Sequence, residues 1–84
     1  MTTFTLPNLT YEVVQADSEM TVHPAGRLDI ETSAPFIKQL APMLRTDQPR
    51  RMVVDLGRLS LLDEFGVAVL AGLKARAAEV GGAF

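Results

Sequence analysis

The sequence contains no cysteine and only one histidine, His23, which excludes several kinds of functional site. Without cysteine the chain forms no disulfide, no thiolate nucleophile and no cysteine-based zinc site. A Ser-His-Asp triad would have to use His23, and one histidine cannot build a histidine-based metal cluster. These absences remove cysteine-based and histidine-cluster sites only; our overall expectation from the sequence is a protein that is not an enzyme, with no catalytic residue, no metal and no cofactor.

The sequence also lacks a strong charge imbalance and a long apolar segment. Its 8 basic and 10 acidic side chains give a net charge of −2, which offers no electrostatic reason to bind nucleic acid or an anionic membrane. No apolar run approaches the roughly 18–20 residues of a membrane span. The first residues lack the basic region and apolar core of a signal peptide. These features predict a cytoplasmic protein that neither binds nucleic acid nor inserts into a membrane.

The chain does contain enough apolar residues for a core. Hydrophobic residues make up 48% of its 84 positions, which argues against disorder. This length corresponds to one domain, residues 1–84. Residues 3–6 alternate as in a short edge strand, and 11–16 and 20–25 predict an antiparallel hairpin. Pro24, which has no N–H, is expected to end the pairing or lie at an edge, and Gly26 to bend the chain out of the sheet.

A first helix is predicted after residue 31. Thr32 or Ser33 suits the N-cap position, and Pro35 suits the first turn. Pro42 is expected to kink this helix or to end its regular part near residue 40 or 41. The side chains at helical spacing that should face the core are Phe36, Ile37, Leu40, Met43 and Leu44.

The second half of the chain predicts a buried strand and a second helix. Residues 50–56 have the continuous apolar character of a central parallel strand. The helix should run from about residue 63 to 80 and stop at Gly81-Gly82, after which Ala83-Phe84 resembles the opening of another strand. From residue 11 the order is thus β-β-α-β-α, an α/β domain with a mixed sheet flanked by helices and a truncated last strand. The stripe of this helix that should face the sheet comprises Gly66, Val69, Leu70, Leu73, Ala77 and Val80.

Carboxylates follow several of the predicted strands. Asp29 follows the hairpin, Asp55 ends the central strand, and Asp63 and Glu64 precede the second helix. In this topology Asp29 and the Asp63-Glu64 pair could share one rim of the sheet. The simplest interpretation makes Asp63 an N-cap and Glu64 a first-turn acid that complements the helix dipole. The alternatives are a Mg²⁺ site and a carboxylate pair for hydrolysis.

The second helix carries a further apolar strip away from its predicted core stripe. One surface helix cannot bury both faces in one core, so this strip indicates a protein-interaction surface or a homodimer contact. The alternative is that a further C-terminal segment covers it. The strip consists of Phe65, Val67, Ala68, Ala71, Gly72 and Ala75.

Taken in order and spacing, a set of short motifs across residues 11–84 resembles the STAS domain family, the anti-sigma factor antagonists and their relatives. The resemblance implies a mixed sheet flanked by helices. It also implies binding of an anti-sigma factor, often a serine kinase, which regulates sigma-factor-dependent transcription in bacteria. The motifs are Gly26-Arg27-Leu28-Asp29, Thr32-Ser33-Ala34-Pro35, Val53-Val54-Asp55-Leu56, Leu62 to Leu70 and Gly81-Gly82.

The sequence departs from the family at its regulatory position. The resemblance implies a phosphorylated serine directly after the aspartate, but Glu64 stands there and cannot be phosphorylated. The family also includes scaffolds of stress-sensing complexes and accessory subunits of lipid ABC transporters, and neither role requires the serine. Family members continue beyond the double glycine, so we expect a domain that is incomplete at its C-terminus. The expected partner-binding residues are Asp29, Asp63, Glu64, Phe65, Val67, Ala68 and Ala71.

Overall fold

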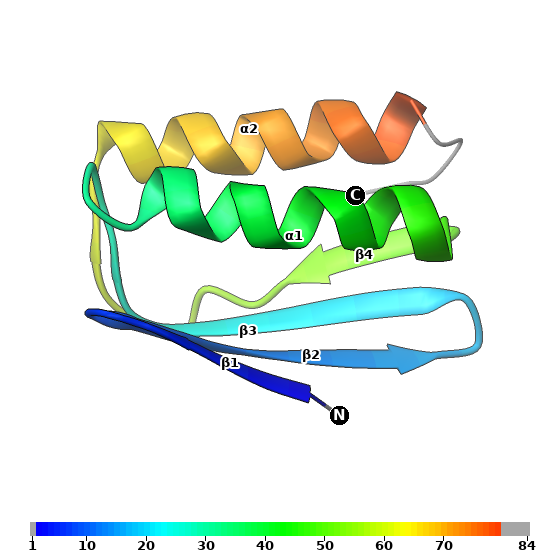
Figure 1. The fold of residues 1–84 in the computed structure, drawn as a ribbon, viewed down its shortest axis with the longest axis horizontal. Coiled ribbons are helices and arrows are strands. Elements are labelled where there is room, and N and C mark those ends of the chain that lie inside the picture. Colours follow the sequence, from blue (N-terminus) through cyan, green and yellow to red (C-terminus); the bar gives the residue numbers. More distant parts are fainter. Residues whose placement is uncertain (1, 80–84) are drawn as a thin grey trace.

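The computed structural model describes residues 2–79 and arranges them as a five-stranded mixed sheet with two helices on one of its faces (Figure 1). The predicted α/β class with a mixed sheet is therefore confirmed. The structure adds β5 to the predicted order, and it confirms the edge strand at residues 3–6 as β1. The elements are β1 (Thr2–Leu6), β2 (Leu9–Ala16), β3 (Glu19–Leu28), α1 (Ser33–Asp47), β4 (Arg51–Val54), β5 (Arg58–Leu62) and α2 (Glu64–Glu79).

Strand β3 is the centre of the sheet. It pairs with β2 in the predicted antiparallel hairpin, and β2 pairs in turn with β1. Along its other edge β3 pairs in parallel with β4 at residues 19–22 and then with β5 at residues 25–28. The parallel pairing predicted for residues 50–56 is confirmed. Its central position is not, because β4 has β3 as its only neighbour among the described strands.

Pro24 does not end the pairing, contrary to the sequence prediction. It is buried within β3 and lies opposite Tyr11 of β2. The carbonyl of Val22 accepts a hydrogen bond from Asp55 N at 2.9 Å, so Val22 directs its backbone groups toward the β4 edge. Pro24, two residues on, directs its nitrogen to the same edge. There the pairing with β4 has ended and that with β5 begins at Ala25, so the missing N–H costs no ladder bond.

Gly26 also lies inside β3 rather than at a bend out of the sheet. The register with β5 shifts between Gly26 and Arg27, which marks a bulge. Gly26 has φ of +107°, a conformation that side chains disfavour, and an added Cβ would lie 2.6 Å from Asn8 O. Glycine is therefore required here because the β1–β2 turn approaches the strand so closely.

Helix α1 continues through Pro42 and ends at Asp47, so the predicted early end near residue 40 or 41 is wrong. Proline removes the amide that would donate to the carbonyl of Lys38. Both residues are exposed, so water can bond that carbonyl. The opposite face of α1 buries Phe36, Leu40 and Leu44 against the sheet, as predicted.

Helix α2 completes the core. Val69 and Leu73 are buried and Leu70 is partly buried, which confirms the described part of the predicted stripe. The predicted stop at Gly81-Gly82 and the strand opening at Ala83-Phe84 lie outside the described residues. The buried core cluster comprises Leu9, Tyr11, Val13, Met20, Val22, Leu28, Phe36, Leu40, Leu44, Met52, Val69 and Leu73.

Candidate partner-binding site

Both helices begin at the same end of the molecule, where β3 and β5 end (Figure 1). The chain reaches α1 through the loop at residues 29–32 and reaches α2 through Asp63. A helix N-terminus carries a partial positive charge, which favours nearby carboxylates. Asp29, Glu31, Asp63 and Glu64 are accordingly found at this end, and the rim predicted from the sequence is present.

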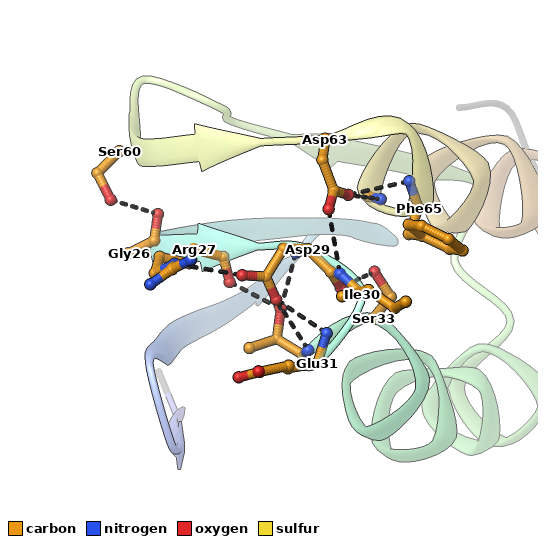
Figure 2. Close-up of polar contacts among 11 residues, drawn as sticks. Gly26, Arg27, Asp29, Ile30, Glu31, Ser33, Ser60, Asp63 and Phe65 are labelled. Carbon is orange, nitrogen blue, oxygen red and sulfur yellow. Dashed lines mark hydrogen bonds and ion pairs between the residues drawn. The ribbon is translucent and has the colours of Figure 1, made fainter.

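The carboxylate of Asp63 joins the segments that lead into the two helices. Its Oδ1 atom accepts hydrogen bonds from the backbone amides of Phe65 at 2.9 Å and Gly66 at 3.0 Å, which is the predicted N-cap arrangement. Its Oδ2 atom accepts a third hydrogen bond from the amide of Ile30 at 3.2 Å (Figure 2). One side chain thus caps α2 and ties the loop before α1 to it.

Asp29 is buried and acts within its own loop. Its Oδ1 atom accepts hydrogen bonds from the amides of Glu31 at 3.0 Å and Thr32 at 3.2 Å, and Arg27 Nε lies 3.2 Å from its Oδ2 atom. Burial raises the pKa of the Asp29 carboxyl, but the two amides and the Arg27 guanidinium outweigh burial and hold that pKa below its ordinary value. Asp29 therefore stays ionised and holds the loop in shape.

The hydroxyls at the start of α1 also face inward. Thr32 occupies the N-cap position but makes no side-chain capping bond. Instead its hydroxyl donates to Arg27 O at 2.7 Å and accepts from Asp29 N at 3.0 Å. The Ser33 hydroxyl donates to Asp29 O. Both side chains are buried, so this segment supplies loop geometry rather than an exposed surface.

The start of α2 carries the exposed side chains of the site. Phe65 is 44% exposed and Val67 is 54% exposed. Glu64, Ala68, Ala71 and Ala75 are also exposed, so the strip predicted to lie away from the core faces outward except at Gly72, which is half-buried.

The sequence analysis missed Ile30, which at 61% is the most exposed large hydrophobic residue described. One apolar residue in a turn is unremarkable in a sequence. Its place beside α2 depends on a bond to Asp63, a residue distant in the chain.

Asp55 is not part of this rim. Its Oδ2 atom lies 3.3 Å from His23 Nδ1, and its Oδ1 atom accepts the Gly57 amide at 2.9 Å. The hydrogen bond from the Gly57 amide is the main cause that holds the pKa of Asp55 below its ordinary value. His23 contributes further, and burial acts in the opposite direction. No three His, Cys, Asp or Glu side chains in the described part of the chain are grouped to hold a metal ion.

A family model described as "Mlab, STAS domain" matches residues 11–84. The chain belongs to the STAS domain family. None of the curated proteins matches its sequence. In the described part of this STAS domain, no helix is long and apolar enough to cross a membrane.

Solved structures share the STAS fold of this chain. One is an anti-sigma factor antagonist from Mycobacterium paratuberculosis, with a TM-score of 0.74 and 26% identity over 94% of this chain and 68% of that one. Another is the anti-sigma factor antagonist SpoIIAA in its unphosphorylated form, with a TM-score of 0.74 and 16% identity over 87% of this chain. A third, Mglu, has a TM-score of 0.71 and 18% identity over 86% of this chain and 18% of that one. This chain spans only 64% of the length of SpoIIAA.

Asp63 and Gly66 at the start of α2 serve two structural purposes, capping of the helix and close packing on β3. A Cβ added to Gly66 would overlap the carbonyl oxygen of Leu28 and would lie 2.7 Å from Leu62 Cδ1. Asp63 and Gly66, three residues apart, therefore act together. The aspartate fixes the first turn of α2, and the glycine lets that turn lie directly on the end of β3.

Proposed function

We propose that this STAS domain is a non-enzymatic, cytoplasmic interaction module that binds an anti-sigma factor or serine kinase and so regulates sigma-factor-dependent transcription in bacteria. The observation that carries the proposal is the exposed pair Phe65 and Val67, beside the acidic Asp63 and Glu64, on a turn that Asp63 fixes. An exposed apolar surface bordered by charge is typical of protein-interaction sites.

The similarity to an anti-sigma factor antagonist at 26% identity supports the same class of partner. Within the site, Asp63, Glu64, Phe65, Val67, Ala68 and Ala71 are the proposed contacts. Asp29 contributes by shaping the loop, because its carboxylate is buried and already bonded.

Glu64 gives the proposed module a fixed charge where the family resemblance implies a reversible one. A glutamate carries one negative charge, whereas phosphoserine carries roughly −1.5 to −2 and offers three acceptor oxygens. The proposed domain therefore works without a phosphorylation switch. In the proposal Glu64 contacts the partner together with Phe65. The alternative is that Glu64 holds the protein permanently in a phosphorylated-like state that does not bind, or that it contacts a different partner.

The first test measures binding of the purified anti-sigma factors and serine kinases of the source organism by isothermal titration calorimetry. Phe65→Ala should weaken binding by about tenfold, as expected for a buried aromatic contact in an interface. Leu56→Ala is the matched control, because Leu56 is 40% exposed but lies between β4 and β5. Binding of none of these proteins to the wild-type domain would refute the proposal.

The second test introduces a hydroxyl at position 64. Glu64→Ser should be phosphorylated by a serine kinase that binds the domain, and the wild type should not. Radiolabelled phosphate transfer measures the difference. A kinase that binds Glu64→Ser firmly and transfers no phosphate would contradict the assignment of position 64 as the phosphoacceptor place.

A second candidate function is an accessory subunit of a lipid ABC transporter or a scaffold of a stress-sensing complex. It is favoured by Glu64, because neither role needs a phosphorylatable residue. The same exposed strip of α2 would then contact a transporter ATPase, a scaffold or a second copy of the chain. Affinity capture that recovers a transporter ATPase, together with sedimentation of the purified domain, distinguishes these outcomes from an anti-sigma factor.

A further inference from the structure

We propose that Ile30 and Phe65 together form the apolar anchor of this surface, and that its protein partner inserts an apolar side chain flanked by arginine or lysine. This inference rests on the proposed function, because it specifies the chemistry of the partner of the same site. It adds Ile30, an exposed apolar residue of the loop before α1, which the sequence analysis did not include among the partner-binding residues.

The first step is geometric. The amides of Ile30 and Phe65 donate to the two oxygens of one carboxylate, at 3.2 Å and 2.9 Å. Their backbones are therefore held at a fixed separation, although they lie far apart in the chain. Figure 2 shows both residues next to Asp63, at the junction of the loop and the helix.

The second step concerns exposure. Ile30 is 61% exposed and Phe65 is 44% exposed, while the loop that carries Ile30 is held in place by the buried Asp29 and Thr32. Large apolar side chains on a rigid backbone lose little conformational entropy when a partner covers them. The pair is thus better suited to binding than exposed side chains on a loose segment.

The third step concerns charge. Glu31 follows Ile30 directly and Glu64 precedes Phe65 directly, and both side chains are exposed. Arg27, near the end of β3, is paired with Asp29 at 3.2 Å. The apolar pair is consequently bordered by exposed acidic side chains on both segments. A partner with a basic border gains from this field, and one with an acidic border is repelled.

The experiment uses two short capped peptides with the same leucines, one flanked by arginines and the other by glutamates. Each is titrated into the isotopically labelled domain and followed by amide chemical shifts. We expect the arginine peptide to shift the resonances of Ile30, Phe65 and their neighbours, and the glutamate peptide to bind at least about tenfold more weakly. Added salt should weaken binding of the arginine peptide.

Variants then assign the anchor. Ile30→Ala and Phe65→Ala should each weaken binding of the arginine peptide about fivefold or more, whereas Leu56→Ala should leave it unchanged. The inference would be overturned if all three variants weakened peptide binding equally, or if both peptides bound equally well. Amide shift changes centred away from Ile30 and Phe65 would also overturn it. These outcomes are separate from the proposed function, which fails if no anti-sigma factor or serine kinase binds the wild-type domain.

A last measurement isolates the positioning role of Asp63. Asp63→Ala removes all three acceptor bonds, so the Ile30 amide should exchange its hydrogen faster by a larger factor than core amides such as that of Val22. Glu64→Gln, which removes a neighbouring charge and keeps the cap, should not change Ile30 exchange. Equal acceleration at Ile30 and in the core would mean that Asp63 only stabilises the fold and does not join the two segments.

Discussion

The two helices lie on the same face of the sheet and begin at the same end, but their outer faces differ (Figure 1). Helix α1 buries Phe36, Leu40 and Leu44 and exposes Lys38 and Arg45. Helix α2 buries Gly66, Val69 and Leu73 but exposes a strip that is apolar or small, comprising Phe65, Val67, Ala68, Ala71 and Ala75.

The difference is that the exposed face of α1 carries charged side chains, whereas that of α2 carries apolar and small ones. Water solvates the charged side chains on the outer face of α1, so leaving this face exposed costs little free energy. Each exposed Å² of apolar surface on α2 forgoes about 25 cal/mol that burial would return. Folding of the described residues does not bury this strip, which is why we propose a binding role for it.

The largest effect on stability is expected from removing a core side chain of α1. Phe36→Ala should destabilise the domain by about 3–5 kcal/mol, because it removes a fully buried aromatic ring and leaves a cavity. Lys38→Ala, on the outer face, should change stability by less than about 0.5 kcal/mol. Urea unfolding monitored by circular dichroism measures both. Similar losses would mean that the two faces of α1 are not distinct.

A smaller effect tests how closely α2 approaches the sheet. Gly66→Ala should cost about 1–3 kcal/mol, because its Cβ would overlap the backbone of Leu28. Gly72→Ala is the matched change in the same helix and should be neutral or stabilise by up to about 1 kcal/mol, since only the movable ends of Arg76 and Ile37 are close. The same urea measurement compares them. Equal losses of stability in the two variants would mean that close contact with β3 is not what requires glycine at position 66.

Acid should lower the stability of the domain, because it protonates Asp29 in the loop before α1. The folded-state pKa of Asp29 lies below its ordinary value of 3.8, so its contribution to stability is complete above that pH and is lost as pH falls below about 4. Urea midpoints between about pH 7 and pH 3 should therefore fall on the acid side. Asp29→Asn should flatten this dependence partly, because Asp55 has a lowered pKa as well. An unchanged slope in the variant would exclude Asp29 as a source.

The smallest effect on stability is expected on the outer face of α2. Val67→Lys makes this face resemble that of α1 and should change the free energy of unfolding by less than about 0.5 kcal/mol, because Val67 is 54% exposed. The same variant should weaken binding of a cognate anti-sigma factor. A large loss of stability would instead show that Val67 belongs to the core.

Periodicity located both helices and the hairpin because a helix or strand that faces a core on one side must repeat its apolar residues with the period of that element. It also separated the core stripe of α2 from the exposed strip. The predictions that failed were the ends of pairing or of regular structure at Pro24, Gly26 and Pro42, which came from general rules for proline and glycine that ignore the surroundings. A break in the ladder, a nearby turn and an exposed helix face accommodate these residues.

The sequence alone determined the α/β class, the family resemblance, and the presence of Asp63 and Glu64 at the start of a helix, because these follow from local patterns. Only the tertiary structure decided that Asp29 is buried and that Ile30 is exposed, and only it showed the bond between Ile30 and Asp63. The physical reason is that such a bond joins segments far apart in the chain, whose meeting depends on how β3 and β5 pair within the sheet.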